Sequence, residues 1–374
     1  MQRPPVVILS GVRWDFLWQR HQALAALFAH AGYPTTFVET TGLANPHPRA
    51  PTLRKIASRL GRAGGEGAST EEGLTVYSPL AAPPTYTVFR WLNRRFFVPR
   101  VVGDLRKKSA EAIVIAYPPT RTTLDVISGL RPRLVLYDCS DDYAHFPGAP
   151  RDVAETEREL LCRADLVSCT STWLLERVRA ARPDAFLSGP AVDYERFAVL
   201  QGAPISGGGI RTVCFFGSLG AERIDLRALR AIVEAGFEVR IVGTLGRVDR
   251  NLLELPGIDY RGEVPHAKLP AALAGVDAFV LPYRLGDLTR GISPAKTYEC
   301  LATGRPVVAA PLPALEGLAG YVYLAGRPGE YVEVLQNLKN LETQERRRER
   351  IELARRNSWE ARFEEIEGTL WRAL

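Results

Sequence analysis

Short apolar runs alternate with helix-length segments along this chain, and this alternation is the feature that most limits its possible folds. Six runs of strand length lie in the first half and four in the second. The predicted strands are residues 6–9, 35–38, 74–77, 112–116, 134–137, 166–169, 213–216, 238–242, 278–281 and 307–309. The predicted helices are residues 19–31, 86–108, 122–130, 152–163, 172–181, 225–235, 268–274, 295–303 and 358–374. This order is typical of parallel sheets covered by helices on both faces, so we predict an α/β fold.

The length of the chain and one glycine-rich segment predict two domains. At 374 residues the chain is too long for one typical hydrophobic core. Near its middle, Gly189 and Pro190 are followed by three consecutive glycines at 207–209, a composition typical of an interdomain linker. We therefore predict two Rossmann-like domains, residues 1–195 and 196–357, followed by a final helix at 358–374.

The composition is that of a soluble globular protein. Hydrophobic residues make up 46% and charged residues 24%, and no apolar run approaches the roughly 20 residues that span a bilayer. Residues 1–5 lead straight into a predicted strand rather than a signal peptide, so we expect a cytoplasmic protein. The net charge of +6 suits anionic partners. Because zinc-finger spacings and aromatic RNA-binding signatures are absent, we do not expect nucleic acid among them.

Three further features are expected to be structural. The five cysteines show no metal-ligand spacing and are predicted to be small core residues. The glycine-rich residues 61–69 are predicted to form a surface loop. The charged run at 345–350 is predicted to be a solvated helix face.

Residues 293–309 carry the strongest signal for a ligand site. Pro294 suits the first turn of a helix, Gly304 suits its end, and an apolar strand follows. Backbone N–H groups of Gly291, Ile292 and Ser293 just before the helix would suit a diphosphate, with Lys296 adding positive charge. Glu299 lies three residues after Lys296, so its carboxylate could accept hydrogen bonds from a ribose diol. The alternative is an ordinary amphipathic helix whose Lys296 and Glu299 form a surface pair.

Five motifs, in order, resemble one family across nearly the whole chain. They are WDFLWQRHQ at 14–22, YDCSDDY at 137–143, GPAVDYERF at 189–197, FGSLG at 216–220 and the segment 293–309. Together they resemble retaining glycosyltransferases of the GT-B fold, in the family 4 group, and most closely its teichuronic-acid-biosynthesis-like branch. The resemblance implies two Rossmann-like domains facing a cleft. It also implies that the helix at 358–374 crosses back onto the first domain.

The resemblance implies an activity and its substrates. The expected reaction moves a sugar, of hexosyltransferase type, from a UDP- or GDP-linked donor to a hydroxyl acceptor in polysaccharide or glycoconjugate synthesis, with retention. The nucleoside-diphosphate sugar is the donor substrate, and neither a metal nor a resident cofactor is implied. A saccharide or a lipid-linked molecule is the expected acceptor. A nucleotide-sugar 2-epimerase and a non-catalytic sugar-nucleotide-binding protein are the alternatives.

Two departures from the family pattern concern the donor site. The family commonly has an acidic residue eight positions before the equivalent of Glu299, and Gly291 stands there in this chain. Many relatives also have an arginine and a lysine after the glycine-rich turn that corresponds to Gly217. We predict that Arg223 or Arg290, with Lys296, supplies the positive charge instead. A surface location is the alternative for both arginines.

The loop after the first predicted strand is the expected acceptor site. Gly11 lets the backbone approach a sugar or phosphate, and Arg13, Trp14 and Asp15 are predicted to contact the acceptor or the donor sugar. The alternative is a tight turn in which Trp14 caps the core. His21 is a further candidate for acceptor binding, against the alternative that a lone histidine is structural.

Two aspartates follow another strand of the same predicted sheet. Asp141 or Asp142 is predicted to contact the transferred sugar or the acceptor, and both are assigned with Lys296 as the catalytic candidates. Helix capping is the alternative for one of them.

The segment at 86–100 mixes aromatic residues with arginines, close in sequence to the basic residues 54–59. It is a candidate for peripheral contact with an anionic membrane, which would suit a lipid-linked acceptor. An amphipathic helix buried in the first domain is the alternative.

Overall fold

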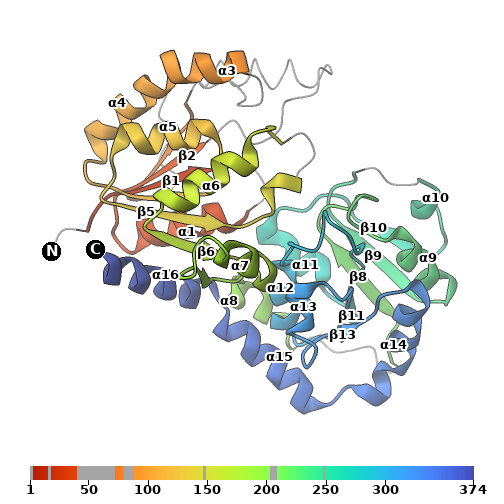
Figure 1. Ribbon diagram of the computed structural model, residues 1–374. Helices are drawn as coiled ribbons and strands as arrows, with labels where there is room; N and C mark the ends of the chain where they lie inside the picture. The colour runs from red at the N-terminus through yellow and green to blue at the C-terminus, as the bar shows by residue number, and fades with distance from the viewer. Residues whose placement is uncertain are drawn as a thin grey trace. The chain divides into compact units, whose positions relative to one another are not determined.

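The computed structural model describes residues 3–15, 18–39, 72–79, 87–145, 149–202, 209–246 and 250–374 (Figure 1). The chain forms two compact units. Unit 1 comprises residues 1–189 and 363–374, and unit 2 comprises residues 190–362. The predicted glycine-rich loop at 61–69 and the basic residues 54–59 lie outside the described residues.

Unit 1 is built on a seven-stranded parallel sheet with the order β3-β2-β1-β4-β5-β6-β7. Its strands are β1 (Val6–Ser10), β2 (Thr35–Glu39), β3 (Leu74–Tyr77), β4 (Ile113–Ala116), β5 (Leu134–Cys139), β6 (Leu166–Cys169) and β7 (Phe186–Leu187). All residues of β1, β4 and β5 are buried, which explains why these strands read as continuous apolar runs rather than alternating ones.

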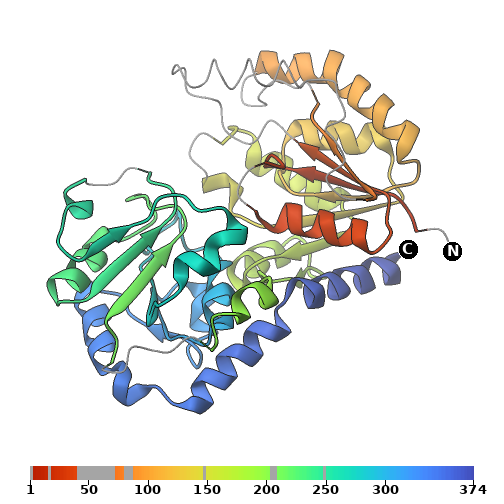
Figure 2. The same ribbon diagram turned by 180° about the vertical axis from the view of Figure 1, so that it is seen from behind.

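Helices cover both faces of this sheet. They are α1 (Arg20–His30), α3 (Thr87–Leu92), η1 (Asn93–Phe97), α4 (Val98–Lys108), α5 (Arg121–Leu130), η2 (Tyr143–His145), α6 (Val153–Arg163), α7 (Thr172–Arg179) and, from Phe363, the last helix α16 (Trp359–Ala373). Helices α4 and α5 pack together on one face. Figure 2 shows α1 and α16 side by side on the other, with the Phe28 and Phe363 rings 4.9 Å apart. The expected return of the last helix to the first domain is confirmed.

Unit 2 is built on a six-stranded parallel sheet with the order β10-β9-β8-β11-β12-β13. Its strands are β8 (Thr212–Phe216), β9 (Glu238–Val242), β10 (Ile258–Tyr260), β11 (Ala278–Leu281), β12 (Val307–Ala309) and β13 (Tyr323–Leu324). Its helices are α8 (Tyr194–Ala198), α9 (Leu226–Glu234), α10 (Arg250–Leu253), η3 (His266–Lys268), α11 (Leu269–Leu273), α12 (Lys296–Ala302), α13 (Pro313–Glu316), α14 (Pro328–Leu341), α15 (Gln344–Arg356) and the start of α16. Helix α9 packs with α14, and α12 packs with α8 and α15.

All ten predicted strands are present, so the predicted α/β fold with two Rossmann-like units is confirmed. The prediction missed β7, β10 and β13, which contain two or three residues each. All three are edge strands, beside β6, β9 and β12, and strands this short carry no periodic pattern of their own.

The predicted continuous helix at 86–108 is interrupted. Residues Asn93–Phe97 form a π-helical turn between α3 and α4, in which the Val98 N–H donates to the Asn93 carbonyl oxygen. Pro99 lacks the N–H that a regular helix would offer to Arg95, which favours a wider turn before it. The buried Asn93 side chain donates to Thr122 Oγ1 at 3.1 Å.

The predicted solvated face at 345–350 is wrong at one position. Arg350 in α15 is only 1% exposed. Its guanidinium is ion-paired with Glu342 and also donates to the Gly304 carbonyl oxygen at 3.2 Å. A charge run in a sequence does not reveal that one arginine is drawn inward by partners from another element.

None of the helices within the described residues combines the length and the apolar character needed to cross a bilayer.

Candidate functional site

The carboxyl ends of β8 and β11 form the centre of the candidate site in unit 2. The strand order reverses between these two strands, and ligands of open α/β sheets bind beyond strand ends at such a point. Lys296, the first residue of α12, reaches this place. Its Nζ donates to the carbonyl oxygen of Phe216, the last residue of β8, at 2.7 Å. The ammonium has three N–H donors, so one of them is used by this bond.

Aromatic rings surround the same ammonium group. Lys296 Nζ lies 4.7 Å from the centre of the Phe215 ring and 5.8 Å from that of Tyr283, which follows β11. Ring faces attract cations, so the charge is held at the strand ends rather than in solvent. The alternative of an exposed Lys296–Glu299 surface pair is therefore not what the structure shows.

Two glycines bring the loops after β8 and β9 close together. Gly217 has a φ of 113° and Gly243 a φ of 139°, both in the region that favours glycine. A Cβ atom on Gly217 would overlap Lys296 Nζ, and one on Gly243 would overlap the Gly217 carbonyl oxygen. The position of the lysine therefore depends on glycine at 217.

The segment before α12 differs from the expected cradle of free N–H groups. The Ile292 N–H, expected to face a diphosphate with Gly291 and Ser293, donates to the Thr289 carbonyl oxygen at 3.0 Å. Helix α12 has seven residues, so its dipole is short. One of the three expected N–H groups is therefore engaged within the chain, and Lys296 supplies positive charge at this site. Gly304, predicted to end this helix, follows it with a φ of 73°.

The two candidate arginines belong to the segments that follow β8 and β11. The Arg223 carbonyl oxygen accepts the Arg284 N–H at 2.8 Å, which ties the loop after β8 to the loop after β11. Arg290 is exposed, and its guanidinium lies 3.2 Å from Asp287. The surface location considered for Arg290 is thus the one observed.

Glu299 is held by residues that sequence reasoning did not select. Its Oε1 lies 3.0 Å from Nε2 of His266, the first residue of η3. The other ring nitrogen of His266 faces the guanidinium of Arg196 in α8. The sequence offers one signal for this group, since Arg196 belongs to the motif at 189–197.

The loop after β1 in unit 1 contains the expected acceptor residues. Arg13 and Asp15 form an ion pair of 2.5 Å within the loop. The Trp14 N–H donates to Glu39 Oε1 at 2.7 Å, and its ring packs edge to face on Phe37 at 5.1 Å. Gly11 lies against His21 and Pro118. The loop is therefore ordered by its own contacts, and Trp14 does cover part of the core.

The His21 side chain contacts the end of β1, where this loop begins. The side chain is buried, its ring stacks on Tyr117 with 3.6 Å between centroids, and Nδ1 lies 2.8 Å from Ser10 Oγ. Burial lowers the pKa of His21 to about 3, although Asp138 opposes the shift. The expected contact between His21 and an acceptor is thus revised, because a neutral, buried ring holds the end of β1 instead.

Acid is expected to destabilise unit 1 through His21. The unfolded histidine binds a proton below pH 6.5 and the folded one only near pH 3, so stability falls as the pH drops between these values. The slope is at most about 1.4 kcal/mol per pH unit, and no loss occurs above pH 6.5. Urea unfolding of the wild type and of His21→Gln at several pH values measures this. Identical slopes in both proteins would contradict the prediction.

Asp138 and Arg20 form a buried ion pair at the carboxyl end of β5. Arg20 Nε donates to Asp138 Oδ2 at 2.6 Å, and the other guanidinium nitrogens donate to Gly189 O at 3.0 Å and Ser188 Oγ at 2.9 Å. Ser168 Oγ donates to Asp138 Oδ1 at 2.8 Å. Burial opposes the positive charge, but Asp138 outweighs it and raises the pKa of Arg20. Each guanidinium nitrogen and each carboxylate oxygen has a hydrogen-bond partner, so the pair links residues at the ends of β5, β6 and β7.

The two catalytic candidates of unit 1, Asp141 and Asp142, lie just after the end of β5. Asp142 is buried and its Oδ2 lies 2.7 Å from His145 Nδ1, while Asp141 is half-buried. Asp141 therefore has the more accessible carboxylate of the two. Among the residues that the structure describes, no group of three or more His, Cys, Asp and Glu side chains is arranged to hold a metal ion.

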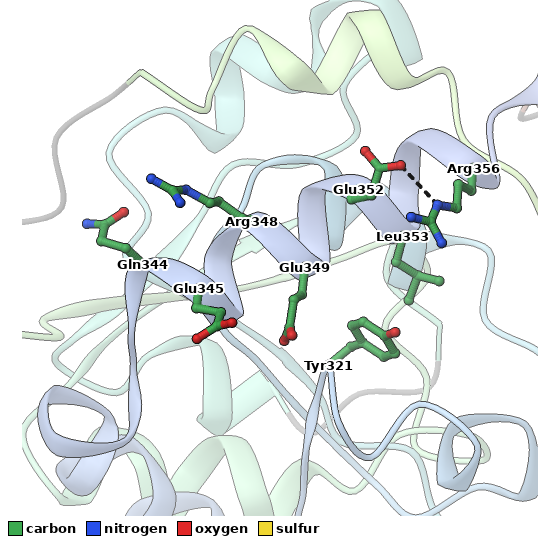
Figure 3. A pocket seen from close by; sticks show the side chains of 8 residues that line it. All are labelled: Tyr321, Gln344, Glu345, Arg348, Glu349, Glu352, Leu353 and Arg356. Atoms are coloured by element: carbon green, nitrogen blue, oxygen red, sulfur yellow. Dashed lines mark hydrogen bonds and ion pairs between the residues drawn. The ribbon is translucent and has the colours of Figure 1, made fainter.

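A groove of about 670 Å³ lies elsewhere in unit 2, along α15 (Figure 3). Glu345 and Glu349 point toward Tyr321 in this view, and Glu352 pairs with Arg356 at 2.9 Å. The groove has neither strand ends nor glycine turns, so its chemistry differs from that of the candidate site.

A known protein family matches the part of unit 2 that contains the candidate site. Residues 210–340 match the family model described as "Glycosyl transferases group 1". This region contains Gly217, His266, Lys296 and Glu299.

One curated protein is similar over a larger part of the chain. The candidate teichuronic acid biosynthesis glycosyltransferase TuaH of Bacillus subtilis (strain 168) is 26% identical over 260 residues. The match covers 62% of this chain and 65% of TuaH, so it spans slightly less than two thirds of that relative's length.

Solved structures show the same fold along nearly the whole chain. The sucrose-phosphate synthase of Thermosynechococcus elongatus has a TM-score of 0.64 at 15% identity, with 99% of this chain and 98% of that one covered. The HepE protein of Anabaena, solved with UDP and glucose, has a TM-score of 0.63 at 14% identity and covers 98% and 99%. The expected GT-B class of fold is confirmed.

Proposed function

We propose that this protein is a glycosyltransferase that moves a sugar from a nucleoside-diphosphate sugar, UDP- or GDP-linked, to a hydroxyl group of an acceptor. Polysaccharide or glycoconjugate synthesis is the proposed setting, because TuaH is assigned to teichuronic acid biosynthesis. The UDP and glucose held by HepE support a donor of this class. We propose retention of the anomeric configuration on the resemblance of the motifs alone.

The observation that carries the proposal is the placement of Lys296. Glycosyl transfer breaks the bond between the anomeric carbon and the diphosphate, and negative charge grows on the departing phosphate. A fixed ammonium group near that phosphate stabilises the charge. Lys296 is held at the strand-order reversal of unit 2 by Phe216, and has donors left for a ligand.

Unit 1 is proposed to bind the acceptor. Arg13, Trp14 and Asp15 follow β1, and Asp141 follows β5, so all lie beyond carboxyl ends of the same sheet. The acceptor oxygen forms the new bond to the anomeric carbon, and its proton passes to the leaving diphosphate or to solvent. A carboxylate such as that of Asp141 would orient the acceptor or the transferred sugar.

Calorimetric binding of UDP, GDP, ADP and TDP to the wild type tests the donor class. Tight binding of UDP or GDP, weakened in Glu299→Ala, would support the proposed site. Radiolabelled UDP- or GDP-sugar offered with a panel of saccharide and lipid-linked acceptors then tests transfer. If none of the four diphosphates bound, the proposal would be wrong.

Two other functions remain distinguishable by product analysis. A nucleotide-sugar 2-epimerase would convert the donor without an acceptor. A non-catalytic binding protein would bind the diphosphate without turnover, and Gly291, in place of the family's acidic residue, is the observation in its favour.

An exposed aromatic face in unit 1 supports contact with a membrane. Val88 and Trp91 are each 59% exposed, and Phe96 is 53% exposed. The Trp91 and Phe96 rings lie 5.8 Å apart, with the exposed Arg94 and Arg95 beside them. These side chains are exposed, so the alternative of an amphipathic helix buried in the first domain does not describe them. We propose that they rest on the anionic inner face of a membrane, from the cytoplasm, near a lipid-linked acceptor.

Binding to phosphatidylglycerol vesicles, but not to phosphatidylcholine vesicles, is the expected result. Trp91→Ala combined with Phe96→Ala should weaken it about tenfold, because two exposed rings that would insert into the lipid surface are lost. Arg94→Glu combined with Arg95→Glu should do the same, and salt should weaken wild-type binding. Leu285→Ala, at an apolar residue 55% exposed in unit 2, is the matched control. Equal flotation of all variants would contradict this contact.

A further inference from the structure

Four polar side chains form a continuous chain across unit 2, ending at the candidate ribose-binding carboxylate. Asp193 and Arg196 form an ion pair of 2.8 Å, and the Arg196 guanidinium donates to His266 Nδ1. His266 Nε2 lies 3.0 Å from Glu299 Oε1. The order is therefore Asp193, Arg196, His266, Glu299.

The chemistry of the arginine assigns the tautomer of His266. A guanidinium has only donors, so the Nδ1 atom that faces Arg196 must act as an acceptor. The proton of the neutral ring then sits on Nε2, which donates to Glu299. Without Arg196 the ring would be able to place its proton on either nitrogen.

The surrounding packing holds the ring in this orientation. Phe197, which is fully buried, contacts the His266 ring edge to face with 5.8 Å between centroids. Asp193 Oδ1 also accepts the backbone N–H of Arg196 at 3.3 Å, so Asp193 caps the N-terminus of helix α8. Asp193, Arg196 and Phe197 all belong to the motif at 189–197, whose purpose the sequence did not reveal. Three of its residues act directly or indirectly on His266.

We infer that His266 is a positioning residue that fixes Glu299 for recognition of a ribose diol. This inference rests on the proposed function. The His266 side chain is 23% exposed and that of Glu299 16%, so the pair lies at the border of solvent. Within the described residues, the only hydrogen bond to the Glu299 carboxylate is the one from His266 to Oε1. Oε2 thus stays available for the 2′- and 3′-hydroxyl groups of a nucleoside diphosphate.

Loss of the histidine should change selectivity more than overall binding. In His266→Ala the carboxylate keeps its charge but loses its fixed orientation, so the affinity for UDP or GDP should fall about tenfold. The affinity for the matching 2′,3′-dideoxynucleoside diphosphate, which has neither hydroxyl group, should change less than twofold. The preference for ribose over dideoxyribose would therefore collapse, whereas a purely structural defect would weaken both ligands alike.

Two variants sharpen this comparison. His266→Gln retains an N–H at the position of Nε2 and should restore most of the ribose preference. Lys268→Gln changes an exposed residue of the same short helix and should leave both affinities unchanged. Thermal melting of each variant shows whether unit 2 remains folded.

Nitrogen NMR of histidine-labelled protein tests the inference without any nucleotide. The expected spectrum shows His266 with its proton on Nε2 in the wild type, and a mixture of tautomers in Arg196→Met. If the wild type bound no nucleotide but showed this spectrum, the proposed function would fail while the hydrogen-bonded chain stood. A proton on Nδ1, or an unchanged ribose preference in His266→Ala, would overturn the inference itself.

Discussion

Replacing Lys296 with methionine is expected to weaken the binding of UDP or GDP by about 10- to 100-fold. Hydrogen bonds to charged groups contribute about 1.5–3 kcal/mol, and each 1.4 kcal/mol corresponds to a factor of ten in affinity. Methionine keeps a similar length and stays compatible with the Phe215 and Tyr283 rings, so the fold should persist. Calorimetry at low ionic strength measures the change.

The matched control is Lys268→Met, which removes one positive charge from an exposed position of unit 2. It should alter affinity less than twofold, because exposed charges are screened. Lys296→Arg should recover only part of the binding, since a planar guanidinium does not fit beside Gly217 as a point charge does. Equal affinities of Lys296→Met and wild type would refute the placement of the diphosphate.

Replacing Asp138 with alanine is expected to destabilise unit 1 by about 3–5 kcal/mol, because it leaves the buried Arg20 without its counter-ion. Arg20 is 8% and Asp138 0% exposed, so neither charge has water as a substitute partner. Urea unfolding followed by tryptophan fluorescence measures the loss. Exchanging both residues for apolar ones, Arg20→Met with Asp138→Leu, should lower the free energy of unfolding much less than Asp138→Ala alone.

Asp184 offers the control for this experiment. It pairs with Arg182 at 2.7 Å but is 59% exposed. Exposed pairs contribute about 0–1 kcal/mol, so Asp184→Ala should shift the unfolding midpoint only slightly. Similar shifts of the unfolding midpoint for Asp138→Ala and Asp184→Ala would show that the buried pair contributes no more to stability than the exposed pair.

The parts of the fold that were predictable are those in which the chemistry is local. Buried parallel strands such as β1 and β11 consist of continuous apolar residues, and this pattern is visible in a short window of sequence. Gly304, with its positive φ, is also recognisable from its place after a helix. The two-residue strands β7 and β13 have no such pattern, because neighbouring strands define them.

The parts of the site that were missed depend on contacts between distant residues. His266 meets a partner 33 residues away and another 70 residues away, so its role is invisible without the fold. Arg20 and His21 begin helix α1, and their polarity gives no sign of burial. Both are buried because Arg20 donates to Asp138 in β5 and the His21 ring stacks on Tyr117, which follows β4. Sequence reasoning located Lys296 and Glu299 correctly as neighbours on α12, but not the groups that hold them.

The division of unit 1 into two stretches of chain has a consequence for biosynthesis. Helix α16 contributes Phe363, Ile366 and Leu370 to buried positions, and Trp371 Nε1 donates to Tyr33 at 2.7 Å. A ribosome must complete the whole of residues 190–362 before it delivers these side chains. Until then unit 1 lacks part of its core, and the apolar surface around Phe28 is uncovered. Unit 2, in contrast, has all its residues in one continuous stretch. The earlier part of the chain therefore completes its fold only after α16 has been synthesised.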